Sequence, residues 1–270
     1  DSLTVKDLKM KFFCFSNIAQ ADSAVHYGQL ANSADPYDCK IVSKLAHHYN
    51  TIQLPDTALH IADRYCRIDS TNVFVNRQKA HALYLIGDYP KALHEYKRLK
   101  DGGDRNESTL YYLALCYANL KDYDAAIGVL DTIVRIVPGY APALNMRAQV
   151  HIQQEDTVAA LADLEASLKI NRYDSEVYAT RALLYAKQER YEEARADFDM
   201  AVACDSTFLA GYFNRALTHN YLNNPMLSLR DFDRVIELDS TSSLGYFNRA
   251  IVRTEIGDYN RALEDFNSVA

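Results

Sequence analysis

The residues that could do chemistry include four arginines, each followed 16 positions later by an aspartate. The pairs are Arg147 with Asp163, Arg181 with Asp197, Arg215 with Asp231, and Arg249 with Asp265. A guanidinium beside a carboxylate can bind an anion or shift the pKa of the carboxyl group. Catalysis, however, requires one asymmetric constellation of groups, whereas here the same pair recurs at a fixed interval. The repetition therefore predicts structural ion pairs.

The same two positions vary together elsewhere in the chain. They hold Lys79 with Glu95, Leu45 with Ile61, and Leu113 with Val129. A cation meets an anion and an apolar residue meets an apolar one, which indicates that the two positions face each other across antiparallel helices. The exception is Lys11 with Tyr27, near the start of the chain.

Histidines and cysteines are the other candidates for chemistry. His26, His60 and His94 recur every 34 residues, as do His47 and His81, but packed helices stand about 10 Å apart, whereas zinc needs nitrogen ligands at about 2 Å. The five cysteines are Cys14, Cys39, Cys66, Cys116 and Cys204; they form neither a CxxC pair nor a metal-spaced cluster, and we expect buried structural thiols. Without a phosphate-binding loop or a nucleophile elbow, the sequence predicts no enzyme, no metal and no cofactor.

These intervals follow from an internal period of 34 residues. One column reads Ala24, Ala58, Ala92, Ala126, Ala160, Ala194, Ser228 and Ala262, and a second reads Phe12, Ala46, Ala80, Ala114, Ala148, Ala182, Ala216 and Ala250. Bulky residues recur in other columns, as in Phe198, Phe232 and Phe266. Small and large side chains in fixed alternation predict an array of equivalent structural repeats.

Each repeat contains two helical patterns. Apolar residues are spaced by three and four, as in Tyr178, Ala182 and Tyr185, which is the period of an amphipathic helix. A short breaker such as Gly87-Asp88-Tyr89-Pro90 separates the two helices. Asp and Ser residues between repeats can cap the helix that follows.

On these columns the sequence resembles the tetratricopeptide repeat (TPR) family. That family has 34-residue helix-turn-helix units with small residues where the helices touch and aromatic residues in the remaining gaps. The segment with Tyr246, Ala250, Tyr259, Ala262 and Phe266 matches this pattern closely. The resemblance implies an all-α fold, a right-handed α-α superhelix of stacked antiparallel helix pairs. Departures are the absence of tryptophan and a first repeat with Phe12 in an alanine column and Gly28 in an aromatic one.

The period divides residues 1–270 as a single TPR array. The repeats are 5–38 (degenerate), 39–72, 73–106, 107–140, 141–174, 175–208, 209–242 and 243–270 (partial). Asp1 and Ser2 fall in the column of Asp69 and Ser70, and the last repeat stops after 28 residues. We therefore expect either a segment of a longer array or self-association through the exposed ends.

Composition excludes several classes of protein. The net charge of −7 and the lack of a basic stripe argue against nucleic-acid binding, and no apolar run approaches the roughly 20 residues that cross a bilayer. The charge is uneven, because residues 1–140 hold 16 basic and 16 acidic side chains but residues 141–270 hold 13 and 20. No targeting segment is recognisable, so the compartment stays open between cytoplasm and periplasm.

The resemblance implies that partners bind along a concave groove lined by the first helix of each repeat. We expect its lining to include Lys40, Lys44, His47, Phe74, Arg77, His81, Tyr84, Tyr111, Tyr112, Met146, Phe213, Asn214, Tyr221, Phe247 and Asn248. The early positions are basic, the middle ones aromatic, and the late ones include two asparagines that could bond a partner's backbone. This distribution predicts that basic residues steer an acidic partner segment to an aromatic centre.

The predicted function is therefore a non-enzymatic scaffold for protein–protein interaction that binds an extended peptide or a partner helix in the groove. The alternative is an architectural or assembly segment of a longer TPR protein that acts through its ends or its convex face. Some TPR proteins bind chaperone tails with a clamp of Lys, Asn, Asn, Lys and Arg. The window that begins at Lys9 continues with Phe13, Lys44, Phe74 and Gln78, so we do not expect that activity.

Overall fold

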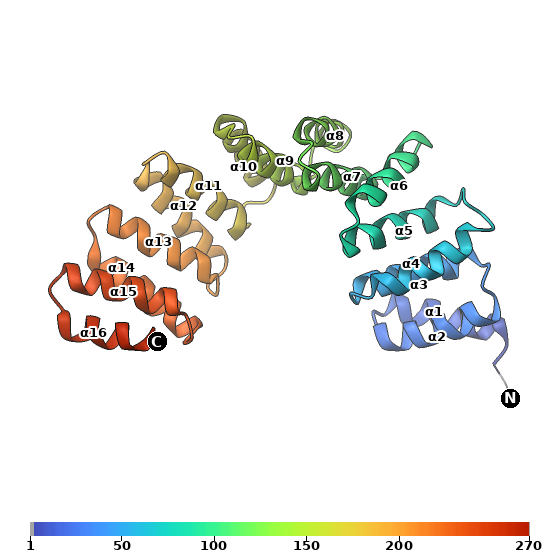
Figure 1. Cartoon of the computed structure of the whole chain (residues 1–270), viewed down its shortest axis with the longest axis horizontal. Helices are drawn as coiled ribbons and strands as arrows, with labels where there is room; N and C mark the ends of the chain where they lie inside the picture. The colour runs from blue at the N-terminus through green and yellow to red at the C-terminus, as the bar shows by residue number, and fades with distance from the viewer. Residues whose placement is uncertain (1–2, 270) are drawn as a thin grey trace. The chain divides into compact units, whose positions relative to one another are not determined.

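The computed structural model of the chain describes residues 3–269; Asp1, Ser2 and Ala270, including the predicted continuation of the column at Asp1 and Ser2, lie outside this range. Within it the chain forms sixteen α-helices and no β-strand (Figure 1). They are α1 (Val5–Asn17), α2 (Ala21–Ala34), α3 (Cys39–Thr51), α4 (Pro55–Cys66), α5 (Val73–Ile86), α6 (Tyr89–Asp101), α7 (Glu107–Asn119), α8 (Tyr123–Ile136), α9 (Ala141–Gln153), α10 (Thr157–Ile170), α11 (Ser175–Lys187), α12 (Tyr191–Cys204), α13 (Leu209–Tyr221), α14 (Pro225–Leu238), α15 (Ser243–Glu255) and α16 (Tyr259–Ser268). None of the helices between residues 3 and 269 is long and apolar enough to span a membrane.

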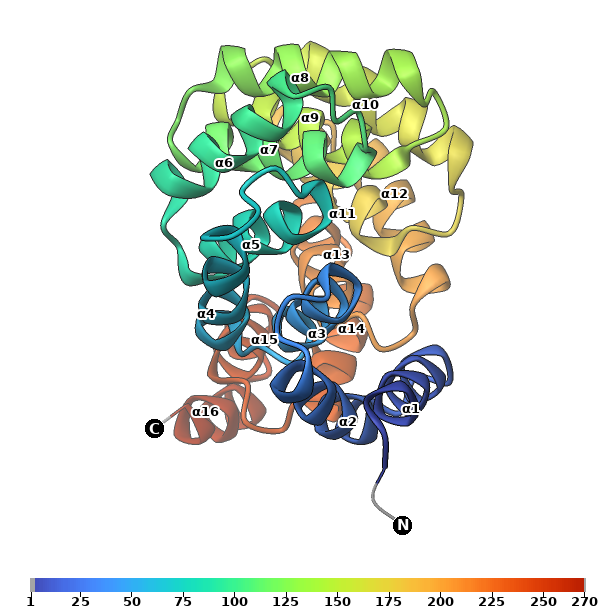
Figure 2. The ribbon, with the colours of Figure 1, turned by 90° about the vertical axis from the view of Figure 1, so that its right-hand side faces the viewer.

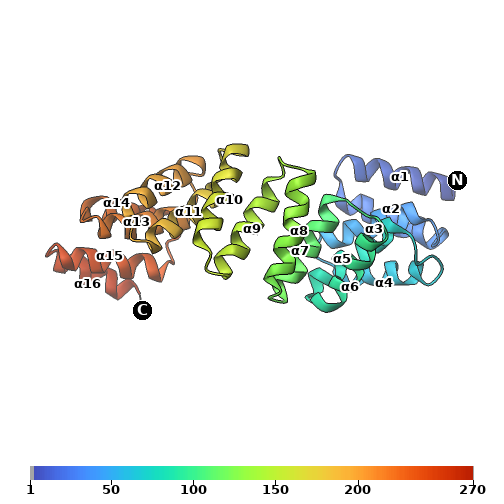
Figure 3. The ribbon, with the colours of Figure 1, turned by 90° about the horizontal axis from the view of Figure 1, so that it is seen from above.

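The helices form two compact halves, α1–α8 and α9–α16, divided between Pro138 and Gly139. In the N-terminal half the pairs α1/α2, α3/α4, α5/α6 and α7/α8 follow one another in chain order (Figures 1 and 2). In the C-terminal half the pairs α9/α10, α11/α12, α13/α14 and α15/α16 do the same (Figures 1 and 3). Each half is thus a stack of helix pairs, and each pair corresponds to one 34-residue repeat.

The two small-residue columns lie where the helices of a pair touch. Every alanine from Ala46 to Ala250 in the first-helix column is fully buried, and the second-helix column from Ala24 to Ala262 is buried throughout. Larger side chains on the second helix, such as Phe198 and Phe232, fill the space beside them and are buried as well. The methyl side chain of alanine lets the two helix backbones approach closely. These columns therefore set the distance between the paired helices.

The first repeat reverses this arrangement of large and small residues. Phe12 occupies the alanine column and is fully buried, while Gly28 occupies the bulky column. A Cβ on Gly28 would lie 2.9 Å from Cε2 of Phe12 and 2.8 Å from Cδ1 of Leu45. The ring of Phe12 therefore occupies the space that a second-helix side chain fills in later repeats, and Gly28 makes room for it.

The turn inside each pair uses a left-handed residue at one fixed position. Its occupants are Ala19, Gln53, Gly87, Lys121, Glu155, Glu189, Asn223 and Gly257, all with φ between 57° and 89°. Only two of the eight are glycine, the residue that adopts this conformation at no steric cost. The breakers read from the sequence mark these turns, but the shared backbone conformation is not visible in the residue types.

The cysteines differ from the expectation of buried thiols. Cys116 on α7 is buried, and burial raises its pKa to about 12. Cys14 is exposed, and the remaining three are only partly buried. Alignment with apolar columns was an insufficient guide because a column is fully covered only where a neighbouring helix lies over it.

Candidate protein-binding site

The predicted groove residues of the N-terminal half lie on three successive first helices. Lys40, Lys44 and His47 are on α3; Phe74, Arg77, His81 and Tyr84 are on α5; Tyr111 and Tyr112 are on α7. We call the surface formed by these nine residues the first-helix face of the N-terminal half. Phe74 is its most prominent apolar side chain, with 65% of its surface exposed.

Four of the nine residues line one pocket on this face. The pocket has a volume of about 240 Å³ and is lined by His47, Arg77, Gln78, His81, Tyr96, Ser108, Thr109 and Tyr112. We call it the imidazole pocket, after its two histidines. The sequence predicted His47, Arg77, His81 and Tyr112 as groove residues, but it did not single out the other four.

Aromatic rings form one side of the imidazole pocket. The ring of Tyr112 lies 4.5 Å from His81 and 6.0 Å from Tyr96, centroid to centroid, and the Tyr96 and Tyr112 planes are only 10° apart. Tyr84 meets Tyr112 edge-on at 5.2 Å. Tyr112 is therefore held from three sides, so it acts as a fixed wall and not as a mobile contact.

A buried aspartate holds Arg77 at the pocket. Arg77 donates from Nε to Asp104 Oδ2 at 2.7 Å and from Nη2 to Asp104 Oδ1 at 2.6 Å. Asp104 also accepts from the Thr109 hydroxyl at 2.8 Å and from the backbone N–H of Asn106 at 3.0 Å. Burial alone would raise the pKa of Asp104, but the hydrogen bond from Arg77 and the other donors outweigh it and lower that pKa. The sequence does not single out Asp104 as the partner of Arg77.

The histidines and lysines of this face differ in their surroundings. Burial lowers the pKa of His81, and the nearby His47 lowers it further. Lys44 donates to Asn17 Oδ1 at 3.0 Å and lies 5.4 Å above the ring of Phe13. Lys40 is exposed at the start of α3. The face is thus basic at one end and aromatic at the other.

In the C-terminal half the predicted residues lie on α9, α13 and α15. Met146 is on α9, Phe213, Asn214 and Tyr221 are on α13, and Phe247 and Asn248 are on α15. Asn214 and Asn248 each donate from Nδ2 to the carbonyl four residues earlier, at 2.9 Å and 2.8 Å. These bonds to their own helices orient the side chains and use one of the two Nδ2 hydrogens.

Exposed rings accompany the asparagines. Phe247 is 44% exposed, and Tyr221 is 68% exposed and stacks on Tyr191 at 4.7 Å with the planes 5° apart. A stacked tyrosine pair presents a rigid apolar surface at little cost in side-chain entropy. The first-helix face of the C-terminal half therefore offers rings and amides where that of the N-terminal half offers basic groups and tyrosines.

The structure brings together the paired arginines and aspartates of the four repeats between residues 141 and 269. Arg181 donates to both carboxylate oxygens of Asp197 at 2.7 Å, and Arg147 donates from Nε to Asp163 at 2.8 Å. Asp163 and Asp197 are each only 6% exposed. Arg215 and Arg249 hold Asp231 and Asp265 in the same two-bond geometry.

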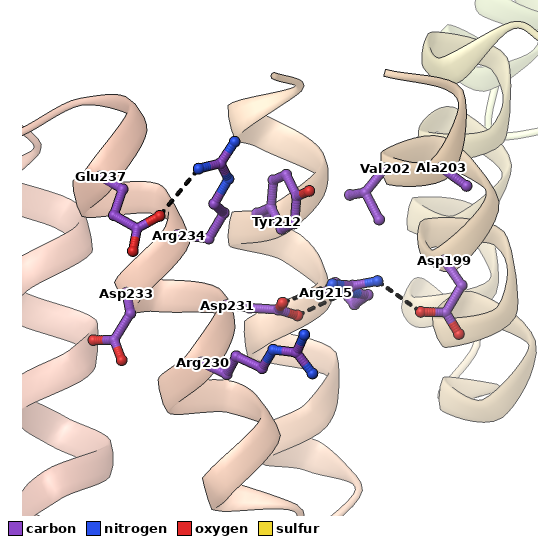
Figure 4. Close-up of a pocket in the computed structure, with 10 residues that line it drawn as sticks. All are labelled: Asp199, Val202, Ala203, Tyr212, Arg215, Arg230, Asp231, Asp233, Arg234 and Glu237. Carbon is purple, nitrogen blue, oxygen red and sulfur yellow. Dashed lines mark hydrogen bonds and ion pairs between the residues drawn. The ribbon is translucent and has the colours of Figure 1, made fainter. Parts of the chain in front are cut away.

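Arg215 and Arg249 also reach the preceding repeat. Arg215 uses Nε and Nη2 for Asp231 and donates from Nη1 to Asp199 on α12 at 2.8 Å (Figure 4). Arg249 likewise donates from Nη1 to Asp233 on α14 at 2.6 Å. In the N-terminal half Lys79 lies 3.0 Å from Asp63 of the preceding repeat and 3.2 Å from Glu95 of its own. We call Lys79, Arg215 and Arg249 the bridging cations, since each joins two repeats.

A buried histidine lies beside one of these pairs. His219 on α13 is 6% exposed, its Nε2 is 3.9 Å from Asp231 Oδ2, and its Nδ1 has no hydrogen-bond partner among residues 3–269. Burial lowers the pKa of His219, and the opposing effects of Asp231 and Arg215 do not reverse this. The imidazole is therefore neutral at neutral pH.

Acidification should destabilise the protein through such histidines. A histidine whose folded-state pKa is lowered contributes stability above its unfolded pKa of about 6.5, and this is lost as the pH falls through the folded value. His48, His81 and His219 all shift in this direction. We expect the free energy of unfolding, measured with urea, to fall as the pH drops from about 7 to about 5, before most carboxylates titrate. His219→Gln should flatten this slope, while His26→Gln, at an exposed position on α2, should leave it unchanged; an identical slope in both variants would contradict the assignment.

Two family models match parts of the chain. A family model described as anaphase-promoting complex, cyclosome, subunit 3 matches residues 53–133, and one described as tetratricopeptide repeat matches residues 145–207. The chain is 28% identical over 116 residues to DnaJ homolog subfamily C member 3 of Gallus gallus. That match covers 37% of this chain and 23% of the relative, so the chain spans under a quarter of the relative's length.

Solved structures match over most of the chain. A tetratricopeptide repeat protein from Parabacteroides merdae has a TM-score of 0.68 at 16% identity, over 96% of this chain and 98% of that one. The C-terminal part of a TPR repeat-containing protein from Cytophaga hutchinsonii has a TM-score of 0.71 at 12% identity, over 84% and 93%. The APC/C hetero-tetramer Cut9–Hcn1 has a TM-score of 0.61 at 12% identity, over 97% of this chain and 52% of that one. At these identities the likeness is one of fold.

Proposed function

Because the chain is a tetratricopeptide repeat protein with an all-α array of stacked helix pairs, we propose that its first-helix faces bind an extended peptide or a helix of a partner protein. The fold is that of a protein–protein interaction scaffold, a class that is typically non-enzymatic. The proposal concerns where the partner binds and what chemistry it carries. The observation that supports it most directly is the imidazole pocket, a cavity that opens among the predicted groove residues.

The N-terminal half supports a partner segment with acidic and apolar groups. Lys40, Lys44 and Arg77 supply cations, while Phe74 supplies an exposed ring with the Arg77 guanidinium 5.7 Å from its centre. Exposed charges accelerate encounter more than they add affinity, and aromatic and arginine side chains are the usual energetic anchors of an interface. We therefore assign steering to the lysines and anchoring to Phe74 and Arg77.

The C-terminal half supports backbone recognition. Asn214 and Asn248 stand one repeat apart on α13 and α15, and each retains an Oδ1 acceptor and a second Nδ2 hydrogen beyond the bond to its own helix. A peptide backbone offers one donor and one acceptor per residue. Two amides spaced by one repeat can bond such a backbone while Phe247 and Tyr221 contact its side chains.

A second candidate function is assembly through the second helices. Several apolar side chains on those helices are exposed, among them Val158 at 79%, Met226 at 70% and Leu263 at 62%. Exposed apolar residues scattered singly are common on soluble proteins. They provide matched control positions for a test of the first-helix faces.

The experiment is capture of partners from an extract of the native host with the tagged chain. Phe74→Ser should lower recovery of a bound partner about tenfold or more, because truncating an aromatic anchor typically costs at least 1–2 kcal/mol of binding free energy. Met226→Ser and Val158→Ser change apolar residues on second helices that are at least as exposed as Phe74, and they should leave recovery unchanged. If recovery of the partner falls with the second-helix variants but not with Phe74→Ser, the partner binds the second helices and the proposal is wrong. Circular dichroism of each variant confirms that the fold is retained.

A further inference from the structure

Resting on the proposed function, we infer that the imidazole pocket binds a phosphoryl group carried by a side chain of the bound segment. None of its eight lining residues is acidic, and six of them carry a hydrogen-bonding side chain other than tyrosine: His47, Arg77, Gln78, His81, Ser108 and Thr109. Thr109 donates to the buried Asp104, so five of these side chains remain as donors to the cavity; with no carboxylate in the lining, this composition favours an anion.

The guanidinium of Arg77 has a free donor group at this pocket. Its Nε and Nη2 are occupied by the two oxygens of Asp104, and Nη1 has no hydrogen-bond partner among residues 3–269. Asp104 is saturated in turn, because four donors from Arg77, Thr109 and Asn106 converge on its two oxygens. Asp104 thus fixes the orientation of Arg77 while the Nη1 hydrogens stay available to a ligand.

The remaining donors come from three different helices. His47 is on α3, Gln78 and His81 are on α5, and Ser108 is on α7. With Arg77, they line the cavity from α3, α5 and α7. A carboxylate has two oxygens in one plane, whereas a phosphate monoester has three terminal oxygens arranged tetrahedrally and a charge of about −1.5 to −2 at neutral pH. The number and spread of donors therefore match the phosphoryl group better than a carboxylate.

The size of the cavity agrees with this class of ligand. About 240 Å³ is more than a single small anion fills, and the rings of Tyr96 and Tyr112 supply an apolar wall. A phosphorylated side chain presents both parts, a charged head for the donors and a carbon stem for the rings. This distinguishes a phosphorylated segment from free inorganic phosphate, which has the head alone.

The test uses NMR of the full chain with carbon-13-labelled histidine. The probe is N-acetyl-O-phosphoserine methylamide; N-acetylglutamate methylamide, N-acetylserine methylamide and inorganic phosphate are compared with it. We expect the His47 and His81 signals to shift with the phosphoserine probe, with an apparent affinity about tenfold or more above that for the glutamate probe. The serine probe should shift neither signal, and His26, on α2, should not respond to any probe.

A charge-reversing variant provides the matched control. Ser108→Glu adds a carboxylate to the pocket from an exposed position in the first turn of α7 and should weaken phosphoserine binding about tenfold or more. Thr57→Glu makes the same change in the first turn of α4, outside the pocket, and should bind as the unmodified chain does. Circular dichroism and thermal unfolding of both variants report on the fold.

Three results would overturn the inference. Equal affinity for the phosphoserine and glutamate probes would show that the pocket responds to negative charge alone. Equal affinity for inorganic phosphate would assign it to a free anion, and unshifted histidine signals would remove the site altogether. The proposed function is tested separately by partner capture with Phe74→Ser. Phosphoserine binding with partner recovery unaffected by Phe74→Ser would support the pocket but not the proposed function. Lost recovery without phosphoserine binding would support the proposed function but not the pocket.

Discussion

Arg181→Ala should lower the free energy of unfolding by about 3–5 kcal/mol, the loss that follows when one partner of a buried ion pair is removed. Asp197 is 6% exposed and receives two hydrogen bonds from Arg181 at 2.7 Å. Alanine would leave that carboxylate buried without its counter-charge. Urea denaturation followed by circular dichroism and by tyrosine fluorescence measures the loss, and two probes are needed because repeat arrays do not always unfold in one step.

The double variant Arg181→Leu with Asp197→Val should be far less affected, within about 1 kcal/mol of the unmodified chain. It copies the pair that the chain itself uses in repeat 107–140, where Leu113 and Val129 are buried. Replacing both members of a buried ion pair by apolar groups of similar volume is often neutral or stabilising. Equal losses in the single and double variants would refute the view that the pair is a replaceable structural unit.

Phe12→Ala should cost a similar amount, about 3–5 kcal/mol, because it empties a buried ring position in the first repeat. Phe12 is fully buried, and its ring touches the space above Gly28 and contacts Phe13 at 5.4 Å between centroids. The neighbouring backbone cannot collapse to fill the cavity, since the paired helices are held apart by the rest of their interface. Thermal and urea unfolding measure the loss.

Combining Phe12→Ala with Gly28→Phe should recover part of that stability, because the remaining close contact of the new Cβ, at 2.8 Å, is with the terminal Cδ1 of Leu45, which can rotate. The double variant places alanine on the first helix and phenylalanine on the second, the arrangement of Ala182 with Phe198 and of Ala216 with Phe232. Gly28→Phe alone should destabilise, because its Cβ already lies 2.9 Å from the ring of Phe12. A double variant no more stable than Phe12→Ala would mean that the first repeat differs from the others in more than this exchange.

The sequence contained enough information for the fold because the repeats can be compared with one another. Columns of alanine, bulky residues and paired charges specify two helices, their contact and their register, and the all-α class that they predicted is confirmed by the helix pairs and by the structural likenesses. The sequence shows Phe12 and Gly28 as two separate departures from the repeat pattern. Only their contact in space shows that each explains the other.

The parts that the sequence did not predict depend on neighbours outside a single repeat. The second bond of the bridging cations joins Arg215 to Asp199 and Arg249 to Asp233, 16 residues earlier, and a comparison confined to one repeat misses it. Asp104 has no counterpart to compare, since its column holds Ser70, Pro138 and Arg172. Asp104 reaches Arg77 because of the path of the loop between α6 and α7. The imidazole pocket was likewise invisible, because it needs residues from α6 as well as from the first helices.

The bridging cations carry an implication for how such an array can grow. Arg215 and Arg249 each bond an aspartate of the preceding repeat, and repeat 209–242 carries both Arg215 and Asp233, the acid that Arg249 uses. A gene duplication that copies repeat 209–242 whole therefore inserts a repeat that has both the arginine and the aspartate that these bonds need. An insertion of any other length would leave an arginine and an aspartate at that junction without their partners. At the junctions that they join, the bridging cations therefore favour repeats of one constant length.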